Sequence, residues 1–481
     1  MEASASAAPW EEVGPEEQLF VLITGANSGI GLGTGQRLID EFLATRSLKA
    51  HLILIPTTRS PSKSLLAIKA LRAHAELAAR TSSALRSRAG DDGYRWQDAA
   101  RRIHVLSPSL DLCDLRGVYA FADRLVRGTL SNPEGLEGEY LRGVRIPRLD
   151  TVVFNAAYGG WSGCNYPKAV WAILSQGLVQ AVTYPNFKNS LATSILNEQE
   201  EYGYPEKPLL GEVFCACVFG HYVLAHQLLP LLSRRATDPP SSRGRIVWSS
   251  SIEAVADVYN PDDMQCFLKP AAYESAKRLT DIIALTYSLP SVRPFSDAFL
   301  RMDDAQSGGD AEEEKPIPPK IYLTHPGVVA STLFPVPWFL FWAYELALVI
   351  ARWVGSPWHC VDGYKGAAST TWLALQDQAS LDELQADRVK WGSSCNRHLQ
   401  SGVKKTEVEG WGWEGKPETD ETIAADTAQG LLHKSVGRRL GAKNVTQEML
   451  VEFEVEGARA WEEMERLRLQ WANILKLGKE E

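Results

Sequence analysis

A glycine-rich turn near the start of the chain limits the folds that this sequence can adopt. The run TGANSGIG occupies residues 24–31, follows the apolar stretch 19–23 and leads into a helical pattern that continues through Ile39. A turn with so little side chain brings backbone N–H groups close to a pyrophosphate, which then lies at the positive end of the helix. Surface turns use the same residues, but a strand before the turn and a helix after it favour dinucleotide binding.

We expect the three glycines of this turn to have separate tasks. Gly25 makes the turn, Gly29 leaves room for the phosphates, and Gly31 lets the helix pack closely on the sheet. The residues predicted to contact the dinucleotide in this turn are Thr24, Gly25, Asn27, Ser28, Gly29, Ile30 and Gly31.

A second pattern supplies a phenol and an ammonium group. The run YESAK at 273–277 opens a helical pattern that continues through Leu285. Tyr273 and Lys277 therefore lie one turn apart on one helix face. A free phenol has a pKa of about 10, and a neighbouring ammonium would lower it and make the proton available near neutral pH. Taken alone, the pattern is more typical of an exposed Tyr and a solvated Lys on an amphipathic helix.

Three features in sequence order resemble the short-chain dehydrogenase/reductase family. They are the TGxxxGxG turn, a Ser after the fifth predicted strand (245–248), and the YxxxK helix. The resemblance implies that Tyr273 donates a proton and that Lys277 also holds the nicotinamide ribose. By the register of the family, Ser251 hydrogen-bonds the substrate carbonyl oxygen, with Ser250 as the alternative.

The end of the second predicted strand indicates which dinucleotide is bound. Enzymes that bind NAD usually carry an acidic residue there to hold the ribose hydroxyls. Here residues 51–55 are followed by PTTRS, which has no carboxylate and includes Arg59. A guanidinium pairs with a 2′-phosphate, whereas a carboxylate would repel it. We therefore predict NADPH, the alternative being that Arg59 merely faces solvent.

Further cofactor contacts are implied by the resemblance alone. Asp111 and Leu112 follow the third predicted strand, where the family has an adenine-contacting Asp. Asn155 opens an NAA run where the family has NAG, and the run PGVVAST at 326–332 resembles the PGxxxT region that contacts the nicotinamide amide. The residues predicted in this region are Val328, Ser331 and Thr332.

One position departs from the family pattern. The family carries an Asn after the fourth strand, which supports a water chain to the catalytic Lys, and Cys217 stands there in this chain. A thiol is a poor substitute for an amide in hydrogen bonding. Activity survives if a backbone carbonyl holds the water and falls if it does not, so this point stays open. His221 is expected in the core or behind the site, without a catalytic role.

The order of apolar runs predicts an α/β fold. Strands alternate with helical patterns, which implies a doubly wound parallel sheet of the Rossmann type with helices on both faces. The six predicted strands are 19–23, 51–55, 103–106, 151–155, 245–248 and 320–324. A helix and an exposed loop are expected at 60–102, insertions at 130–148 and 184–210, and a disordered loop at 303–318.

We divide the chain at residue 375. Residues 17–375 form the predicted NADP-binding reductase domain, including a membrane-facing segment at 333–355. The family pattern is lost beyond this domain, so residues 376–481 form a C-terminal extension with a charged amphipathic helix at 447–477. This helix is expected to pack back on the domain, with partner binding as the less favoured alternative.

Composition argues against several functions. The net charge of −9 and the pI near 5.6 argue against nucleic acid as the main partner. The seven Cys show no metal-binding spacing, so we predict no metal and expect reduced thiols in a cytosol-facing protein. Residues 1–17 lack the apolar run of a signal peptide.

An apolar segment at 338–354 does not fit a plain soluble enzyme. Only Glu345 and Arg352 interrupt it, aromatic residues lie at both ends, and its length is near the lower limit for crossing a bilayer. We predict a helix that lies in one leaflet, the alternative being a core or dimer-interface helix. The segment follows 326–332, where the family has its substrate lid, so a lid dipping into the membrane would admit a lipid-soluble substrate sideways.

Longer runs narrow the resemblance within the family. They are VFGHYVLAHQLLPLL at 218–232, IVWSSSIEA at 246–254 and YKGA at 364–367, and they resemble the fungal 3-keto-steroid reductases of ergosterol synthesis. The resemblance implies NADPH-dependent reduction of the C-3 ketone of 4-methyl sterols to the 3β-hydroxyl. It also implies a place at the cytosolic face of the endoplasmic reticulum or on lipid droplets, with the sterol C-4 demethylation enzymes and lanosterol synthase as partners. The alternatives are a reductase of another lipid carbonyl, such as a 17-keto steroid or retinal, and a non-catalytic scaffold of the demethylation complex.

Overall fold

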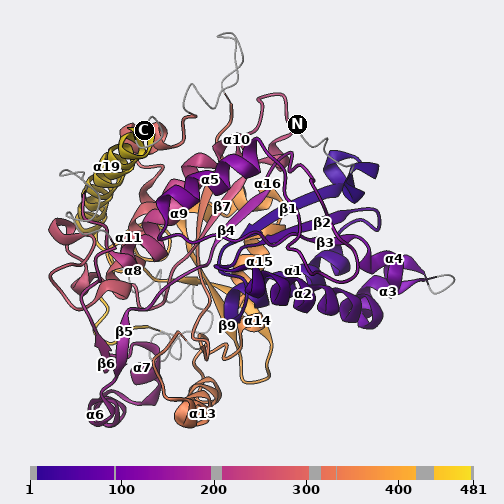
Figure 1. The fold of residues 1–481 in the computed structure, drawn as a ribbon. Coiled ribbons are helices and arrows are strands. Elements are labelled where there is room, and N and C mark those ends of the chain that lie inside the picture. The colour runs from indigo at the N-terminus through magenta and orange to yellow at the C-terminus, as the bar shows by residue number, and fades with distance from the viewer. Residues whose placement is uncertain are drawn as a thin grey trace.

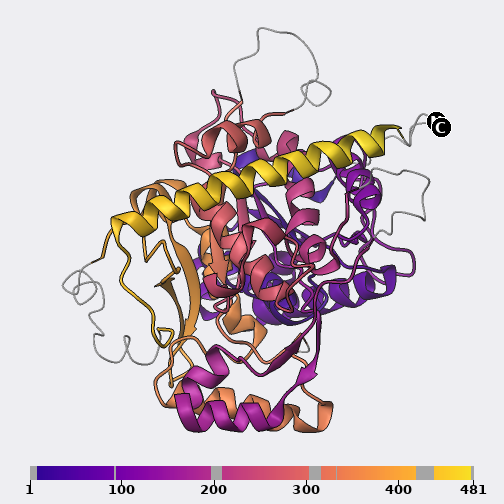
Figure 2. The ribbon, with the colours of Figure 1, turned by 90° about the vertical axis from the view of Figure 1, so that its left-hand side faces the viewer.

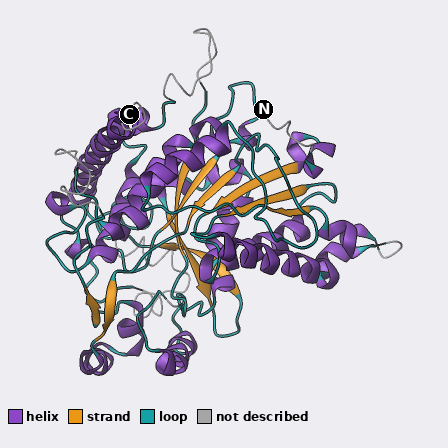
Figure 3. Ribbon diagram, in the orientation of Figure 1, coloured by secondary structure: helices purple, strands orange, loops and turns teal. Residues whose placement is uncertain are grey.

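A mostly parallel sheet is the centre of the fold (Figures 1 and 3). The computed structural model describes residues 8–90, 94–196, 208–302, 316–331, 333–418 and 438–477. The strand order is β10-β9-β8-β7-β4-β1-β2-β3, and β10 pairs antiparallel with β9 while the other pairs are parallel. The strands are β1 (Gln18–Ile23), β2 (His51–Pro56), β3 (Ile103–Val105), β4 (Thr151–Phe154), β7 (Arg245–Ser249), β8 (Lys320–His325), β9 (Lys390–Cys395) and β10 (Ser401–Thr406).

The six predicted strands and the doubly wound α/β class are confirmed. Each predicted strand matches an observed one to within one residue at either end. Their nearly continuous apolar runs are typical of parallel strands that are covered on both faces. The sheet, however, continues past the predicted boundary at residue 375, because β9 and β10 extend it beyond β8. The short runs KWGSSC and SGVKKT lack the apolar pattern that reveals the other strands.

Helices cover the two faces of the sheet in separate layers (Figure 1). One layer contains α1 (Gly29–Thr45), α2 (Pro61–Thr81) and α15 (Ala368–Leu375), which share one apolar core. The opposite layer contains α5 (Leu115–Val126), α9 (Gly220–Gln227) and α11 (Ala272–Thr286), which share the larger core. The shorter helices are α3 (Ser83–Ala89), α4 (Trp96–Ala100), α8 (Glu212–Phe214), α10 (Leu229–Leu232), α12 (Arg293–Phe299), α14 (Gly363–Gly366) and α16 (Gln378–Glu383).

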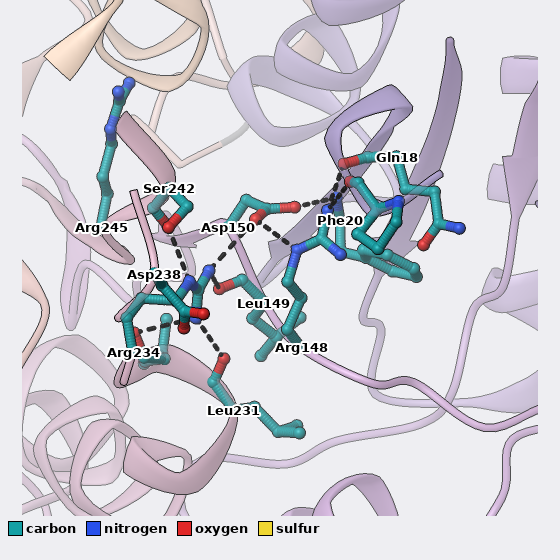
Figure 4. A network of polar contacts seen from close by, with 12 residues as sticks. Gln18, Phe20, Arg148, Leu149, Asp150, Leu231, Arg234, Asp238, Ser242 and Arg245 are labelled. Atoms are coloured by element: carbon teal, nitrogen blue, oxygen red, sulfur yellow. Dashed lines mark hydrogen bonds and ion pairs between the residues drawn. The ribbon is translucent and has the colours of Figure 1, made fainter. Parts of the chain in front are cut away.

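Asp150 ties the amino ends of two central strands together (Figure 4). Its carboxylate accepts hydrogen bonds from the backbone N–H of Phe20 at 2.8 Å, from Nε of Arg148 at 2.9 Å and from Nη2 of Arg234 at 3.1 Å. Phe20 lies in β1 and Asp150 directly precedes β4. The network therefore fixes these strands at the end opposite to the glycine turn.

An insertion between β4 and α8 forms a small unit below the sheet in Figure 1. It contains a two-stranded sheet, β5 (Trp161–Cys164) and β6 (Lys188–Ser190), with α6 (Tyr166–Gln176) and α7 (Leu178–Thr183) between the strands. The predicted insertion at 184–210 overlaps it only in part, and residues 197–207 lie outside the described residues. Most of the loop predicted at 303–318 also lies outside them.

The C-terminal helix α19 (Gln447–Leu477) packs along the outer side of α11 (Figure 2). Phe453, Trp461 and Met464 are buried in the contact, and the indole of Trp461 donates to the carbonyl of Ile283 at 3.2 Å. The prediction that this helix packs back on the domain is therefore confirmed.

Candidate active site

The glycine turn lies at the carboxyl end of β1 and requires glycine at two positions. Gly25 has φ of 64° and Gly29 has φ of 54°, in the left-handed region that favours glycine. A Cβ on Gly25 would lie 2.9 Å from Cα of Ala156, whereas a Cβ on Gly29 would meet nothing within 4 Å. The space beside Gly29 is therefore open, and it lies at the amino end of α1, where an anion is stabilised.

Gly31 has a different task from the one expected. A Cβ there would lie 2.4 Å from the carbonyl oxygen of Gly25 and 2.6 Å from the amide nitrogen of Asn155. Gly31 thus lets α1 approach the turn itself and the loop after β4, rather than the sheet. The close helix contact belongs to Gly33, where a Cβ would lie 2.4 Å from the backbone of Gly363 in α14.

Thr24 and Asn155 hold the turn in shape. The Thr24 hydroxyl accepts hydrogen bonds from the backbone N–H groups of Asn155 and Ala156, each at 3.0 Å. The Asn155 amide donates to the carbonyls of Thr24 and Gly25 at 3.1 and 3.2 Å. Both side chains bind the protein backbone, so their contribution to ligand binding is through the shape of the turn.

His221 connects the glycine turn to the helix behind the site. Its Nε2 lies 2.8 Å from the Thr24 hydroxyl and its Nδ1 lies 3.2 Å from the carbonyl of Cys217. The ring is fully buried, and burial lowers its pKa to about 3, so it is neutral at physiological pH. The sequence pattern gave no signal for this link, because the partners are far apart in the chain.

Tyr273, Ser251 and Lys277 come together at the carboxyl end of β7. The Ser251 side chain hydrogen-bonds Tyr273 and accepts from the backbone N–H of Glu253 at 3.1 Å. Nζ of Lys277 lies 5.6 Å from the centre of the Tyr273 ring and donates to the carbonyl of Ser249 at 2.7 Å. All three predicted groups therefore lie within one small region.

Ser250 faces away from this group. Its hydroxyl donates to Oδ1 of Asp281, which is buried in α11. Oδ2 of Asp281 lies 2.6 Å from Nζ of Lys390 in β9, and that ammonium also donates to the carbonyl of Ser251 at 2.7 Å. Lys390 was not foreseen in the sequence, yet it holds the backbone of the Ser that faces Tyr273.

The pKa of Tyr273 departs from the expected direction. Burial raises it well above its ordinary value, and the charge of Glu253 raises it further, while the hydrogen bond with Ser251 lowers it. Burial also lowers the pKa of Lys277. The predicted lowering of the Tyr273 pKa is therefore wrong, because burial and the neighbouring Glu253 raise it. A phenol in this setting keeps its proton at neutral pH.

Cys217 lies in a π-helical turn, η3 (Cys215–Phe219), that precedes α9. Its Sγ lies 3.4 Å from both the backbone nitrogen and the backbone oxygen of Tyr158. The thiol thus binds the loop that follows β4. Burial raises the pKa of Cys217, while the charge of Lys277 opposes that shift. A π-helical turn is often found at functional sites.

The remaining predicted cofactor residues surround the turn. Arg59 is exposed just after β2, and Asp111 is exposed after β3, where its carboxylate accepts from the backbone of Cys113 at 3.0 Å. Leu112 is buried, while Asn27 and Ser28 hydrogen-bond each other through their side chains at the turn. Ile30, Val328 and Ser331 line the cavity described next, and Thr332 lies outside the described residues.

An apolar cavity of about 310 Å³ opens beside these groups. Ser251, Tyr273 and Glu253 are among the polar residues that line it. Apolar side chains from the β5–β6 insertion, from residues 334–340 and from α13 (Phe341–Trp353) form much of the rest, among them Trp161, Phe187, Phe334, Leu340, Ala343 and Ala347. The lining suits an apolar ligand with a polar group that reaches Ser251 and Tyr273.

Comparison with known proteins places the chain among reductases. It is 63% identical over 475 residues to 3-keto-steroid reductase ERG27 of Gibberella zeae, covering 98% of each chain. It is also 38% identical to 3-keto-steroid reductase erg27 of Aspergillus fumigatus, covering 95% of each. The chain belongs to the 3-keto-steroid reductase family. No family model matches the sequence.

The similarity to these family members extends beyond the predicted boundary at residue 375. The alignment with the Gibberella zeae protein spans 98% of this chain, which includes β9, β10 and α19. With 3-keto-steroid reductase erg27 of Schizosaccharomyces pombe the identity is 27% over 81% of this chain. The C-terminal region is therefore shared with the Gibberella zeae protein.

Solved structures resemble the chain only distantly. Salutaridine reductase of Papaver somniferum is 15% identical, with 66% of this chain and 88% of that chain covered and a TM-score of 0.34. A 3-oxoacyl-[acyl-carrier protein] reductase of Brucella melitensis in complex with NAD is 13% identical, with 74% and 89% covered and a TM-score of 0.37. Similarity at this level supports no conclusion about the site.

Two further features are absent from the described residues. In that part of the chain, no group of His, Cys, Asp and Glu has a metal-binding arrangement. No described helix is both long enough and apolar enough to cross a bilayer. The segment predicted to lie in one leaflet forms η7 (Trp338–Leu340) and α13, and much of its apolar surface is exposed rather than in the core.

Proposed function

We propose that this protein uses NADPH to reduce the C-3 ketone of 4-methyl sterol intermediates to the 3β-hydroxyl in ergosterol biosynthesis. The observation that carries the proposal is the placement of Ser251 and Tyr273 in the wall of a mainly apolar cavity, with Lys277 beside them. Such a wall suits an apolar substrate whose carbonyl oxygen reaches these two groups. The names of the family members support the same substrate class.

The residues around the glycine turn fit NADPH. The open space beside Gly29 and the amino end of α1 suit the pyrophosphate. Arg59 is exposed at the end of β2, where an NAD-binding enzyme usually carries a carboxylate, and it is free to reach a 2′-phosphate. When bound, NADPH supplies the hydride.

The chain's own residues then deal with the substrate oxygen. Ser251 donates a hydrogen bond to the carbonyl oxygen and holds it in place. Tyr273 would transfer its phenolic proton to the carbonyl oxygen as negative charge develops there. The product is the alcohol, and the phenolate regains a proton before the next turnover. Lys277 stabilises the phenolate during that interval.

The test measures NADPH oxidation with a 4-methyl-3-keto sterol. We expect Tyr273→Phe to lower kcat by about 100-fold or more, because no proton reaches the oxygen. Ser251→Ala should lower kcat by a similar factor, while Ser250→Ala, a matched change one residue away, should act mainly on stability. Equal rates for wild type and Tyr273→Phe would reject the assigned acid. A folded wild type without turnover would reject the proposed activity and favour the scaffold.

We further propose that the protein lies on the cytosolic face of the endoplasmic reticulum or on lipid droplets, through two helices at the mouth of the cavity. Helices α6 and α13 lie at the same end of the molecule in Figures 1 and 2, and both contribute to the cavity wall. Many exposed side chains on these helices and on the adjoining η7 are apolar or aromatic. They include Tyr166, Val170, Trp171, Leu174, Trp338, Phe339, Trp342, Leu346, Ile350 and Trp353.

Vesicle flotation tests the membrane surface. Replacing Trp171, Trp338 and Trp342 by Ser should move the protein from the vesicle fraction to the soluble fraction, since each ring loses its place at the interface. Leu66→Ser, which removes an equally exposed apolar side chain on α2, should leave binding unchanged. Unaltered flotation of the triple variant would contradict the proposal. Association with the C-4 demethylation enzymes and lanosterol synthase stays a prediction, testable by co-purification from membranes.

A further inference from the structure

Three charged side chains form a buried cluster behind the Tyr273 ring. Nζ of Lys188, the first residue of β6, lies 2.6 Å from Oε2 of Glu253 and forms an ion pair with Glu274. The three side chains are only 3%, 16% and 11% exposed, respectively. Glu253 follows β7 closely and lines the cavity, and Glu274 is the neighbour of Tyr273 on α11.

The cluster touches the phenol through aromatic contacts as well. Nζ of Lys188 lies 4.2 Å from the centre of the Trp161 ring and 5.8 Å from that of Tyr273. The two rings meet edge to face with centres 4.7 Å apart. The β5–β6 insertion therefore holds one side of the Tyr273 ring, with an ammonium and two carboxylates next to it.

The charges in this cluster do not balance. Two carboxyl groups face one ammonium, so the cluster holds one more acidic than basic group beside the phenol. Burial and then the charge of Glu253 raise the pKa of Tyr273, with smaller upward effects from Cys217 and Glu274. Burial alone would lower the pKa of Lys188, but the two carboxylates raise it overall, so it stays charged.

We propose that three positioning residues, Lys188, Glu253 and Glu274, hold the Tyr273 ring at the cavity. They also keep its phenol protonated, so that the phenol can give a proton to the substrate oxygen. The excess of acidic over basic groups disfavours the phenolate, so the phenol holds the proton that reduction requires. Lys188 holds both carboxyl groups beside the ring through its ion pairs. Burial raises the pKa of Glu253, and the charge of Lys188 opposes that shift. The role of the cluster in turnover rests on the proposed function, whereas its effect on the phenol does not.

Fluorine NMR of the full-length protein labelled with 3-fluorotyrosine tests the effect on the phenol directly. The Tyr273 resonance is assigned by its loss in Tyr273→Phe and followed to the highest pH at which circular dichroism shows the native fold. In Glu253→Gln we expect it to begin moving toward the phenolate position about one pH unit earlier than in wild type. Glu383→Gln, which removes one exposed charge on α16, should follow the wild-type curve. The proposal is overturned if the Tyr273 resonance follows the same curve in Glu253→Gln and in wild type, whether or not it moves within the accessible pH range.

Two further variants keep the test decisive. Glu274→Gln should shift the resonance in the same direction by a smaller amount, and it carries the test if Glu253→Gln does not fold. Glu253→Asp keeps the charge and should restore most of the wild-type curve, which a purely structural role would not predict. In steady-state kinetics, the alkaline limb of the pH profile of kcat/KM should move to lower pH in Glu253→Gln. If the wild type reduces no 3-keto sterol, the proposed function fails while the NMR titration still decides the role of the cluster.

Discussion

At the scale of single residues, the direction of a side chain at the end of a strand decides its role in this site. Ser250 and Ser251 are adjacent and chemically identical, and the sequence pattern left them as alternatives. Successive side chains at the end of a strand point to opposite sides, so one hydroxyl reaches Asp281 and the other reaches Tyr273. The direction of each side chain therefore decides which of the two serines faces Tyr273, whereas their identical chemistry does not.

The same scale explains why the pKa of Tyr273 differs from the value that the sequence predicts. Spacing along a helix shows that Lys277 lies one turn away, and that distance alone favours a lowered pKa. The burial of the phenol and the position of Glu253 depend on the packing of β7 and of the insertion against α11. Those contacts join residues that are distant in the chain, so spacing gives no sign of them.

Arg59 gives a prediction about cofactor choice. Arg59→Ala should raise the KM for NADPH by about 10- to 100-fold, because a charged hydrogen bond to the 2′-phosphate is worth about 1.5–3 kcal/mol. Steady-state kinetics with NADPH and NADH measure the change. The KM for NADH serves as the internal control and should stay within about twofold, since NADH has no phosphate at that position. Equal losses for both cofactors would contradict the role of Arg59.

At the scale of elements, β9 supports the site from outside the predicted reductase domain. It adds a strand to the sheet beside β8 and brings Lys390 under the Ser251 carbonyl. Its polar side chains form buried hydrogen bonds. The hydroxyl of Ser393, for example, bonds that of Ser369 in α15, which in turn bonds that of Thr324 in β8. A strand that is stabilised by polar side chains lacks the alternation of apolar residues from which strands are predicted.

Lys390→Met tests this support. The change leaves the buried Asp281 carboxylate without its ammonium partner, so we expect a loss of about 3–5 kcal/mol in the free energy of unfolding. Urea unfolding measures it. Lys416→Met, which removes one member of an exposed ion pair at 3.5 Å, should change stability by less than about 1 kcal/mol. The Lys390→Met/Asp281→Asn double variant should recover part of the lost stability. Similar losses for Lys390→Met and Lys416→Met would contradict the prediction.

At the scale of the whole molecule, several buried histidines make stability depend on pH. Burial lowers the pKa of His104, His221 and His359 to about 3, whereas an unfolded His titrates near 6.5. Between these values the unfolded chain binds more protons, so each group lowers stability as the pH falls from about 6.5 towards 3. Above about pH 6.5 this contribution is constant.

The His104→Gln variant isolates one such contribution. Between about pH 7 and pH 5 the wild type should lose about 2 kcal/mol more stability than the variant, because the variant lacks one proton-binding group in its unfolded state. The free energy of urea unfolding at the two pH values gives this difference. His398→Gln, at an exposed position, should keep the wild-type dependence. If His104→Gln kept the pH dependence of the wild-type unfolding free energy, the assignment of this contribution to His104 would be contradicted.

The sequence by itself determined the parallel sheet, the glycine turn at the end of β1, and the placement of Tyr273 and Lys277 one turn apart on one helix. These follow from local periodicity and from short motifs, which neighbouring residues along the chain specify. Only the tertiary structure decided the rest: the β9–β10 edge, the insertion that brings Lys188 to the phenol, and the link from His221 to Thr24. Each of these depends on contacts between distant segments, whose free energy comes from burial and pairing that no local pattern encodes.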